Sequence, residues 1–322
     1  MPEFRHLTTT AQLERVWIES ELFPACEALR QRSEPEAVLK GRSLYCLFYE
    51  PSFLTRTSFE RAIGLLGGQA YHTEDASQFH PVRTPDHIDN IISILASLHV
   101  NLVVLRNSDV GVVESAAKAD ALPIINGGSL DDHPTQALAD IYTLNRELGV
   151  IDGITISVVG RLEHRNVSAL LKGLALFRDV KVTLIPFSGQ ADPDVVSYCE
   201  DRGMELATVS DTEAMRDADA IYLNGPRTLA HAQLMRSRGS INLRIDSDFM
   251  SMLKPHCVIL DPMQRSGDFA VEVRDRRLAG GHRRGVHLLQ RPPVRPGHSR
   301  VLETTGSCGQ RRSHRLRYPL RL

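Results

Sequence analysis

The stretch EPSFLTRTSFE, residues 50–60, places hydroxyl groups and a guanidinium where a helix is expected to begin. Backbone N–H groups at a helix start carry partial positive charge and bind phosphate, and Ser52, Thr55 and Arg56 would add side-chain donors. The apolar periodicity predicts that this helix begins near Thr57. The alternative interpretation is a plain helix cap, in which a hydroxyl only satisfies the backbone.

His133 and Gln136 lie three residues apart in the motif HPTQ, where a helix over 135–148 is expected. At this spacing both side chains share one face of the first turn. The imidazole can donate to a carbonyl oxygen, and the amide can read a neighbouring NH2 group. Arg106 ends an expected strand and suits an anion. The alternatives are a satisfied polar pair in HPTQ and an ion pair between Arg106 and Asp109.

The composition argues against several other kinds of site. The sequence has no GxxxxGK[ST] loop, no GxGxxG after a strand and no metal-ligand cluster, so we expect neither cofactor nor metal. Five scattered cysteines and an N-terminus without an apolar core predict a cytoplasmic protein with reduced thiols. No run of 18 apolar residues indicates a membrane span. The acidic body before residue 274 argues against nucleic acid.

Strands and helices alternate along the chain, which is typical of doubly wound parallel sheets. Expected strands cover residues 44–49, 70–72, 100–105, 121–126, 154–159, 181–185, 220–223 and 258–260; expected helices lie within 8–33, 57–66, 88–95, 135–148 and 167–174. Ligands of such sheets bind beyond the carboxyl ends of strands. We expect Glu50, Arg106, the Asp132-His133 loop, Gly160 and residues 224–227 at that edge.

These motifs resemble the aspartate/ornithine transcarbamylase family over residues 48–275. The family pattern F-x-E-P-S-T-R-T-R-x-S-F-E aligns without gaps on FYEPSFLTRTSFE, and H-P-T-Q is matched outright. The family's strand-end arginine falls on Arg106, and its H-P-L-P-R segment on DPMQR, residues 261–265. The resemblance implies an α/β fold with two doubly wound parallel-sheet domains and the active site in the cleft between them.

The resemblance also implies a reaction and its residues. The carbamoyl group of carbamoyl phosphate moves to the amino group of L-aspartate, giving N-carbamoyl-L-aspartate and phosphate for pyrimidine biosynthesis. The catalytic residues implied are Thr55, Arg106, His133 and Arg83; those for carbamoyl phosphate are Ser52, Thr55, Arg56, Arg106, His133, Gln136, Met263 and Gln264; those for the amino acid are Arg165 and Arg227. The family works as a homotrimer with shared active sites.

Several positions depart from the family pattern. Phe53 replaces a threonine and Leu54 an arginine of the phosphate-binding turn, while Arg83 stands in for a loop lysine. Gly225 replaces the arginine of the T-R-V-Q segment, with Arg227 as the substitute. Arg165 matches the arginine that holds the acceptor's carboxylate when one residue is deleted before it; without the deletion Asn166 takes that place.

We expect a carbamoyl-phosphate-binding domain at residues 1–140, an amino-acid-binding domain at 141–275 and an atypical tail at 276–322. From residue 274 the chain has thirteen arginines against Asp275 and Glu303, so a frameshift and a disordered basic tail are both considered. Two further functions stay open. One is a transcarbamylase for another amino-acid acceptor, and the other is a catalytically impaired homologue that assembles with an active enzyme.

Overall fold

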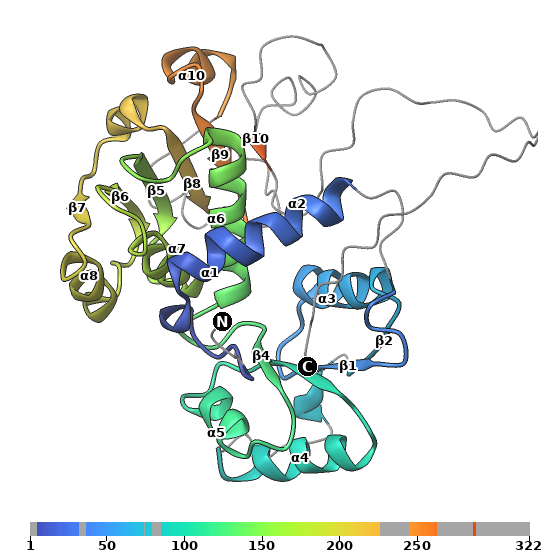
Figure 1. Ribbon diagram of the computed structural model, residues 1–322. Coiled ribbons are helices and arrows are strands. Elements are labelled where there is room, and N and C mark those ends of the chain that lie inside the picture. Colours follow the sequence, from blue (N-terminus) through green and yellow to red (C-terminus); the bar gives the residue numbers. More distant parts are fainter. Residues whose placement is uncertain are drawn as a thin grey trace, which may run out of the picture. The chain divides into compact units, whose positions relative to one another are not determined.

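The computed structural model describes residues 5–31, 37–73, 75–78, 85–225, 245–262 and 286–287. Two parallel β-sheets with flanking helices make up this part of the chain (Figure 1). The α/β class expected from the sequence is therefore confirmed. Within the described residues, no helix combines the length and apolar character needed to cross a bilayer.

A nearly continuous run of helix opens the described chain, as the sequence predicts for residues 8–33. Its parts are η1 (Thr10–Gln12), α1 (Arg15–Trp17), the π-helical η2 (Ile18–Leu22) and α2 (Phe23–Gln31). Thr9 caps the first turn, and the Gln12 side chain bonds back to the cap backbone. This reciprocal arrangement fixes where the helical run begins.

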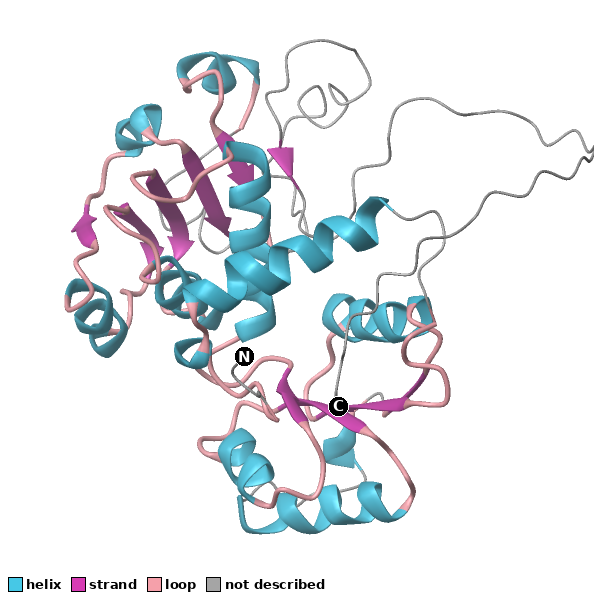
Figure 2. Cartoon of the chain, in the orientation of Figure 1, coloured by secondary structure: helices cyan, strands magenta, loops and turns pink. Residues whose placement is uncertain are grey.

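The first sheet has the strand order β2-β1-β3-β4, with all neighbours parallel. Its strands are β1 (Ser43–Phe48), β2 (Gln69–His72), β3 (Leu102–Arg106) and β4 (Ile124–Asn126). The helical segments between them are α3 (Phe53–Leu65), η3 (Ala76–Gln78), α4 (Pro85–Ser97) and α5 (Val112–Lys118). Helices thus alternate with the strands of the sheet (Figure 2).

The second sheet has the order β10-β9-β8-β5-β6-β7 and is also parallel. Its strands are β5 (Thr155–Arg161), β6 (Lys181–Ser188), β7 (Glu205–Thr208), β8 (Ala220–Asn224), β9 (Val258–Leu260) and β10 (Val286–His287). The helical segments are α6 (Pro134–Leu148), which leads into the sheet, α7 (Arg165–Leu174), α8 (Pro193–Glu200), η4 (Thr212–Asp217) and α10 (Ser247–Met252).

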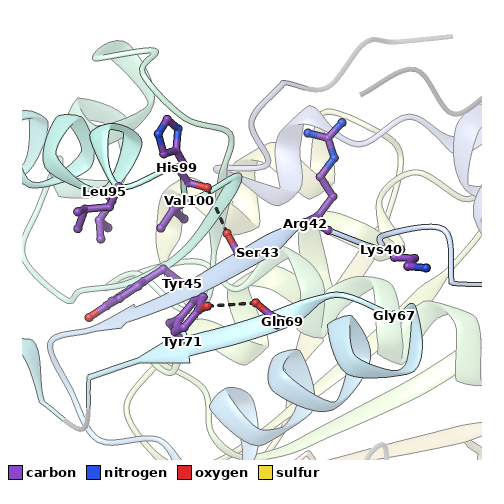
Figure 3. A pocket seen from close by; sticks show the side chains of 12 residues that line it. Lys40, Arg42, Ser43, Tyr45, Gly67, Gln69, Tyr71, Leu95, His99 and Val100 are labelled. Atoms are coloured by element: carbon purple, nitrogen blue, oxygen red, sulfur yellow. Dashed lines mark hydrogen bonds between the residues drawn. The ribbon is translucent and has the colours of Figure 1, made fainter.

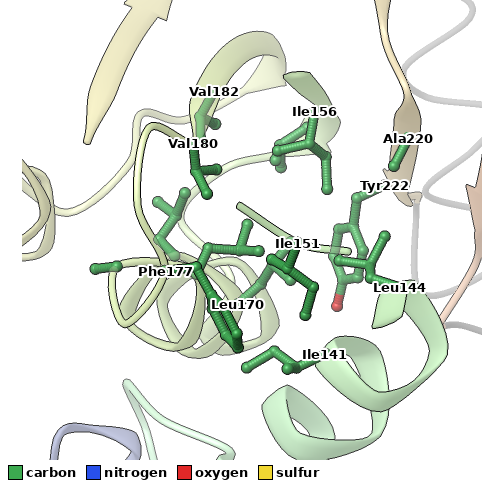
Figure 4. Packing of buried hydrophobic residues seen from close by; sticks show 14 of the residues in the cluster. Ile141, Leu144, Ile151, Ile156, Leu170, Phe177, Val180, Val182, Ala220 and Tyr222 are labelled. Atoms are coloured by element: carbon green, nitrogen blue, oxygen red, sulfur yellow. The ribbon is translucent and has the colours of Figure 1, made fainter. Parts of the chain in front are cut away.

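The largest apolar cluster joins the second sheet to helices that precede it in the chain. Ile156 and Val158 of β5 pack with Ile141 and Leu144 of α6 and with Ile18 of η2. Figure 4 shows Ile141 and Leu144 beside Tyr222 of β8. The helix that begins at HPTQ is therefore held by the core of the second sheet. The domain boundary at residues 140 and 141 stays a prediction.

Some boundaries and elements differ from the sequence prediction. Helix α3 begins at Phe53, four residues before the expected start at Thr57. Helices α5 and α8 were not predicted because seven or eight residues are too few for a clear apolar period. Strand β7 was missed because it is largely exposed and lacks an apolar run. Apart from β10, the tail at 276–322 lies outside the described residues.

A pocket of about 620 Å³ lies at the opposite end of the first sheet from Arg106. It is lined by Ser43 and Gln69, the first residues of β1 and β2, together with Tyr45, Tyr71 and His99 (Figure 3). Because β1, β2 and β3 are parallel, Arg106 belongs to the carboxyl edge and this pocket to the amino edge. Among the described residues, none of those predicted for the site lines this pocket.

Candidate active site

The start of α3 leaves its first amide groups without a side-chain cap. Ser52 is the N-cap residue in extended conformation, and its hydroxyl makes no capping hydrogen bond. The first backbone bond back to Ser52 comes from the Arg56 amide at 3.2 Å. The amides of Phe53, Leu54 and Thr55 therefore form the positive end of a thirteen-residue helix, which suits an anion better than the plain-cap interpretation.

The two apolar residues of the first turn have different surroundings. Phe53 is 66% exposed, whereas Leu54 is half-buried. Arg56 lies 3.7 Å from Glu60 one turn later, and Glu60 also contacts His72 at 2.7 Å. The guanidinium of this turn is thus held on the helix by a carboxylate, while Leu54 supplies no charge.

Arg106 ends β3 and is buried. Its Nη1 donates to the Gly127 carbonyl at 3.1 Å, and its Nε lies 3.6 Å from the Glu50 carboxylate. Gly128 has φ +122°, and a Cβ there would come within 2.7 Å of Arg106 Nη1. A side chain at this position would both strain the backbone and displace the guanidinium.

His133 is the N-cap residue of α6 and is also buried. Its amide donates to Asp132 Oδ1 at 2.8 Å, and its Nδ1 lies 3.4 Å from Thr135 Oγ1. Burial, followed by the positive charges of Arg106, Arg165 and His164, lowers the pKa of His133 well below its usual value. The imidazole is therefore neutral at physiological pH and acts as a hydrogen-bonding group.

Arg165, the first residue of α7, contacts the same carboxylate as Arg106. Its Nη2 lies 3.3 Å from Glu50 Oε2, and its Nη1 donates to the carbonyls of Gly128 and Ser129. Burial alone would raise the pKa of Glu50, but a hydrogen bond from Ser108 and the charges of Arg165 and Arg106 lower it. Glu50 is therefore an ionised partner shared by two arginines, one at the end of β3 and one at the start of α7.

The structure brings three of the seven described site residues together. Arg106 and Arg165 both contact Glu50, and Arg106 and His133 both lie against Gly128. The charges of Arg106 and Arg165 also act on His133. Arg165 contacts Glu50, and the choice between Arg165 and Asn166 as the residue that holds the acceptor's carboxylate stays a prediction. Four other predicted residues lie outside the described part of the chain: Arg83, Arg227, Met263 and Gln264.

Gln136 makes a contact that the sequence analysis missed. Its Nε2 donates to Asp140 Oδ1 at 3.0 Å, and Asp140 Oδ2 accepts from the Tyr222 hydroxyl at 3.0 Å. Asp140 follows Gln136 by four residues on the same helix, so the i,i+4 spacing could have revealed this pair. Nothing comparable in the sequence indicated the contact with Tyr222, because Tyr222 lies 82 residues after Asp140.

Asp132 is a second buried carboxylate that the sequence analysis did not single out. It accepts from Thr9 Oγ1 at 2.8 Å, from the Thr10 amide at 3.0 Å and from Lys172 Nζ at 3.1 Å. The same carboxylate also accepts a hydrogen bond from the backbone amide of His133. It therefore joins the N-terminal segment, α7 and the start of α6. Among the described residues, no group of three or more His, Cys, Asp or Glu could hold a metal ion.

Comparison with known proteins agrees with this geometry. The family model "Aspartate/ornithine carbamoyltransferase, carbamoyl-P binding domain" matches residues 5–146. A catalytic subunit of aspartate carbamoyltransferase from Methanococcus vannielii is 31% identical over 245 residues, which cover 74% of this chain and 78% of that protein. Aspartate carbamoyltransferase 2 from Pisum sativum is 32% identical over 252 residues, 76% of this chain. The match spans only 65% of the pea protein's length.

Solved structures show the same relationship. Aspartate transcarbamoylase from Trypanosoma cruzi, in complex with carbamoyl phosphate, superposes with a TM-score of 0.74 at 27% identity, covering 84% of this chain and 88% of that one. The catalytic subunit from M. jannaschii gives a TM-score of 0.73 at 26% identity, covering 84% and 90%. Sequence, fold and the HPTQ site agree: the chain belongs to the aspartate/ornithine carbamoyltransferase family.

Proposed function

We propose that this chain is a transferase that moves the carbamoyl group of carbamoyl phosphate to the amino group of L-aspartate, in pyrimidine biosynthesis. The products are N-carbamoyl-L-aspartate and phosphate. The observation that carries the proposal is the pairing of Arg106 and Arg165 with Glu50, two residues before the N-cap of α3, with His133 beside the same two arginines. The named activity of the M. vannielii and pea relatives supports it, as does a T. cruzi structure with carbamoyl phosphate and aspartate.

The first step is binding of carbamoyl phosphate. Its phosphate lies against the first amides of α3, with Ser52, Thr55 and Arg56 as further donors. The neutral imidazole of His133 donates Nε2–H to the carbonyl oxygen when Nδ1 accepts from Thr135. Arg106 adds positive charge near the same oxygen, and Gln136 accepts from the NH2 group. Met263 and Gln264 complete this half of the site.

The second step is attack by the acceptor's amine on the carbonyl carbon. The new C–N bond forms and the C–O bond to phosphate breaks with its electron pair leaving on the phosphate, which takes up the proton that the amine gives up. Arg165 and Arg227 hold the carboxylates of the acceptor. Donors aimed at the developing oxyanion each supply about 3 kcal/mol, so positioning and charge account for catalysis.

An impaired homologue with an assembly role is the second candidate. The first turn of α3 favours it, because Leu54 and the exposed Phe53 stand where the family pattern has an arginine and a threonine. Without that arginine, less charge stabilises the leaving phosphate. A transcarbamylase for a different amino acid is the third candidate, because Gly225 replaces an arginine of the family pattern.

One assay separates these candidates. Phosphate release from carbamoyl phosphate is measured with L-aspartate and with a panel of other amino acids, for the wild-type chain and for Leu54→Arg. Fastest turnover with L-aspartate supports the proposal, and turnover confined to another amino acid identifies a different acceptor. No turnover in either protein, together with retained binding of carbamoyl phosphate, establishes the impaired homologue.

We also propose a cytoplasmic homotrimer in which Arg83 of one copy completes the site of the next. In each copy, residues 1–140 bind carbamoyl phosphate, residues 141–275 bind the amino acid, and the site lies in the cleft between them. Mixing Arg83→Ala with His133→Ala tests the sharing, because one site of a mixed trimer then keeps both residues. Recovery of activity on mixing supports shared sites. An inactive mixture whose chains have exchanged contradicts them.

A further inference from the structure

The side chain of Asp140 is completely buried, and both its carboxyl oxygens have hydrogen-bond donors. Oδ1 accepts from Gln136 Nε2 and Oδ2 from the Tyr222 hydroxyl, each at 3.0 Å. Tyr222 is itself fully buried in β8 and points towards α6 near Leu144 (Figure 4). A buried carboxyl group destabilises the folded protein unless its oxygens accept hydrogen bonds. Gln136 and Tyr222 supply these bonds to Asp140, so the three side chains form one hydrogen-bonded chain.

The contact with Asp140 determines how the Gln136 amide is turned. An amide has a donor end and an acceptor end, and its Nε2 is used by the carboxyl group. Turning the amide over would bring its carbonyl oxygen against a carboxyl oxygen. Burial raises the pKa of Asp140 well above its usual value, and a proton on the carboxyl can be shared with Tyr222 on the other oxygen. With the carboxyl ionised, or with its proton on Oδ2 and donated to the Tyr222 oxygen, Oδ1 stays an acceptor, so the acceptor end of Gln136 is directed away from Asp140.

We propose that Asp140 and Tyr222 are positioning residues that fix the Gln136 amide with its oxygen towards the bound substrate. This inference rests on the proposed function and deepens it. A site with a fixed acceptor prefers an acyl phosphate that ends in NH2, such as carbamoyl phosphate. It disfavours acetyl phosphate, which has the same shape but carries a methyl group there, because the methyl leaves the amide oxygen of Gln136 without a donor.

The strand that carries Tyr222 gives this contact a second consequence. Tyr222 lies two residues before Asn224, which ends β8 and donates from Nδ2 to the Arg161 carbonyl at 2.6 Å. The hydroxyl of Tyr222 thus ties α6, the helix that carries Gln136, to strand β8 of the second sheet.

Binding measurements test the positioning role. The dissociation constants of carbamoyl phosphate, acetyl phosphate and inorganic phosphate are measured for the wild type, Gln136→Ala, Asp140→Leu and the double variant. We expect the wild type to prefer carbamoyl over acetyl phosphate by about tenfold, the worth of one hydrogen bond with its desolvation. In both single variants we expect the ratio of the acetyl phosphate to the carbamoyl phosphate dissociation constant to fall towards one. The affinity for inorganic phosphate changes by less than about twofold.

The double variant decides whether Asp140 acts through Gln136. If it does, the double variant shows no further loss of preference beyond Gln136→Ala, since the two effects are not additive. A further loss, or an unchanged preference in Asp140→Leu, overturns the inference alone. A wild-type chain that binds none of the three ligands overturns the proposed function, and the inference with it.

A milder pair of variants keeps the test valid if Asp140→Leu does not fold. Tyr222→Phe removes only the hydroxyl, and we expect it to reduce the preference for carbamoyl phosphate by a factor of two or more, of the order of a weakened hydrogen bond. Tyr142→Phe is the matched control. Tyr142 lies on α6, and its hydroxyl, like that of Tyr222, donates to a carboxylate: Glu27, at 2.6 Å. Equal effects of the two substitutions would contradict the assignment.

Discussion

At the scale of single residues, Gly128 controls the space around the Arg106 guanidinium. Its positive φ disfavours any side chain, and the nearest neighbour of an added Cβ is Arg106 Nη1 at 2.7 Å. Gly149, the C-cap of α6, also has positive φ but has no atom within 4 Å of such a Cβ. The two glycines therefore differ in crowding while sharing the same kind of backbone conformation.

We predict that Gly128→Ala weakens carbamoyl phosphate binding by at least about tenfold, because the guanidinium must move away from its position beside Glu50. Both Gly128→Ala and Gly149→Ala lose more than about 1 kcal/mol of unfolding free energy through backbone strain. Titration calorimetry and denaturant unfolding measure the two effects. Equal binding by both variants would show that the position of Arg106 is not set by Gly128.

His133 gives a pH prediction with a definite sign. Its pKa is lowered in the folded protein, so below about pH 6.5 the unfolded chain binds a proton that the folded chain does not. The free energy of unfolding therefore falls as the pH decreases from about 6.5, with a limiting slope of about 1.4 kcal/mol per pH unit. His133→Gln removes this contribution. Denaturant unfolding at several pH values measures it, and identical slopes in both proteins would contradict the prediction.

At the scale of elements, the loop before α6 is held by Asp132. This carboxylate and Lys172 of α7 are 4% and 14% exposed, and they lie 3.1 Å apart. Asp132 also binds the Thr10 amide of η1. The start of α6, and with it His133, is therefore placed by two other elements as well as by the loop's own hydrogen bonds.

We predict that Asp132→Ala lowers the free energy of unfolding by about 3 kcal/mol, because it leaves the Lys172 ammonium buried without its carboxylate. The control is Glu205→Ala, whose partner Lys181 is 57% exposed; its effect is within about 0.5 kcal/mol. Urea unfolding compares the two. Similar small losses would mean that the Asp132 contacts add little to stability.

At the scale of the whole molecule, the core of the second sheet is built partly from the N-terminal helices. Leu13, Ile18 and Phe23 belong to the same buried cluster as β5 and α7. Ile18 is fully buried, whereas Val16, two residues earlier, is 73% exposed. Residues at the start of the chain therefore stabilise a sheet that begins at residue 155.

We predict that Ile18→Ala costs about 2–5 kcal/mol of unfolding free energy by leaving a cavity, whereas Val16→Ala changes it by less than about 0.5 kcal/mol. Thermal unfolding measures the two losses of stability. Amide hydrogen exchange in β5 then checks whether the effect of Ile18→Ala reaches the second sheet. Exchange in β5 that is unaffected by Ile18→Ala would show that the N-terminal helices are not part of that core.

The sequence by itself determined the local features of this protein. Alternating strands and helices predicted parallel sheets because burial imposes a different apolar period on each element. HPTQ predicted the start of α6, and the end of an apolar run placed Arg106 at a strand's carboxyl end. The short helices α5 and α8 and the exposed strand β7 escaped detection, since too few of their residues are patterned by burial.

Only the tertiary structure decided which distant side chains meet. Glu50 lies between Arg106 and Arg165, and Asp140 joins Gln136 to Tyr222. Spacing along the chain carries no information on the pairs of Glu50 with the two arginines or of Asp140 with Tyr222, because contacts between separate elements depend on how their faces pack. The Arg165 guanidinium likewise reaches Glu50 across 115 positions of the sequence, a contact that only the packing of separate elements sets.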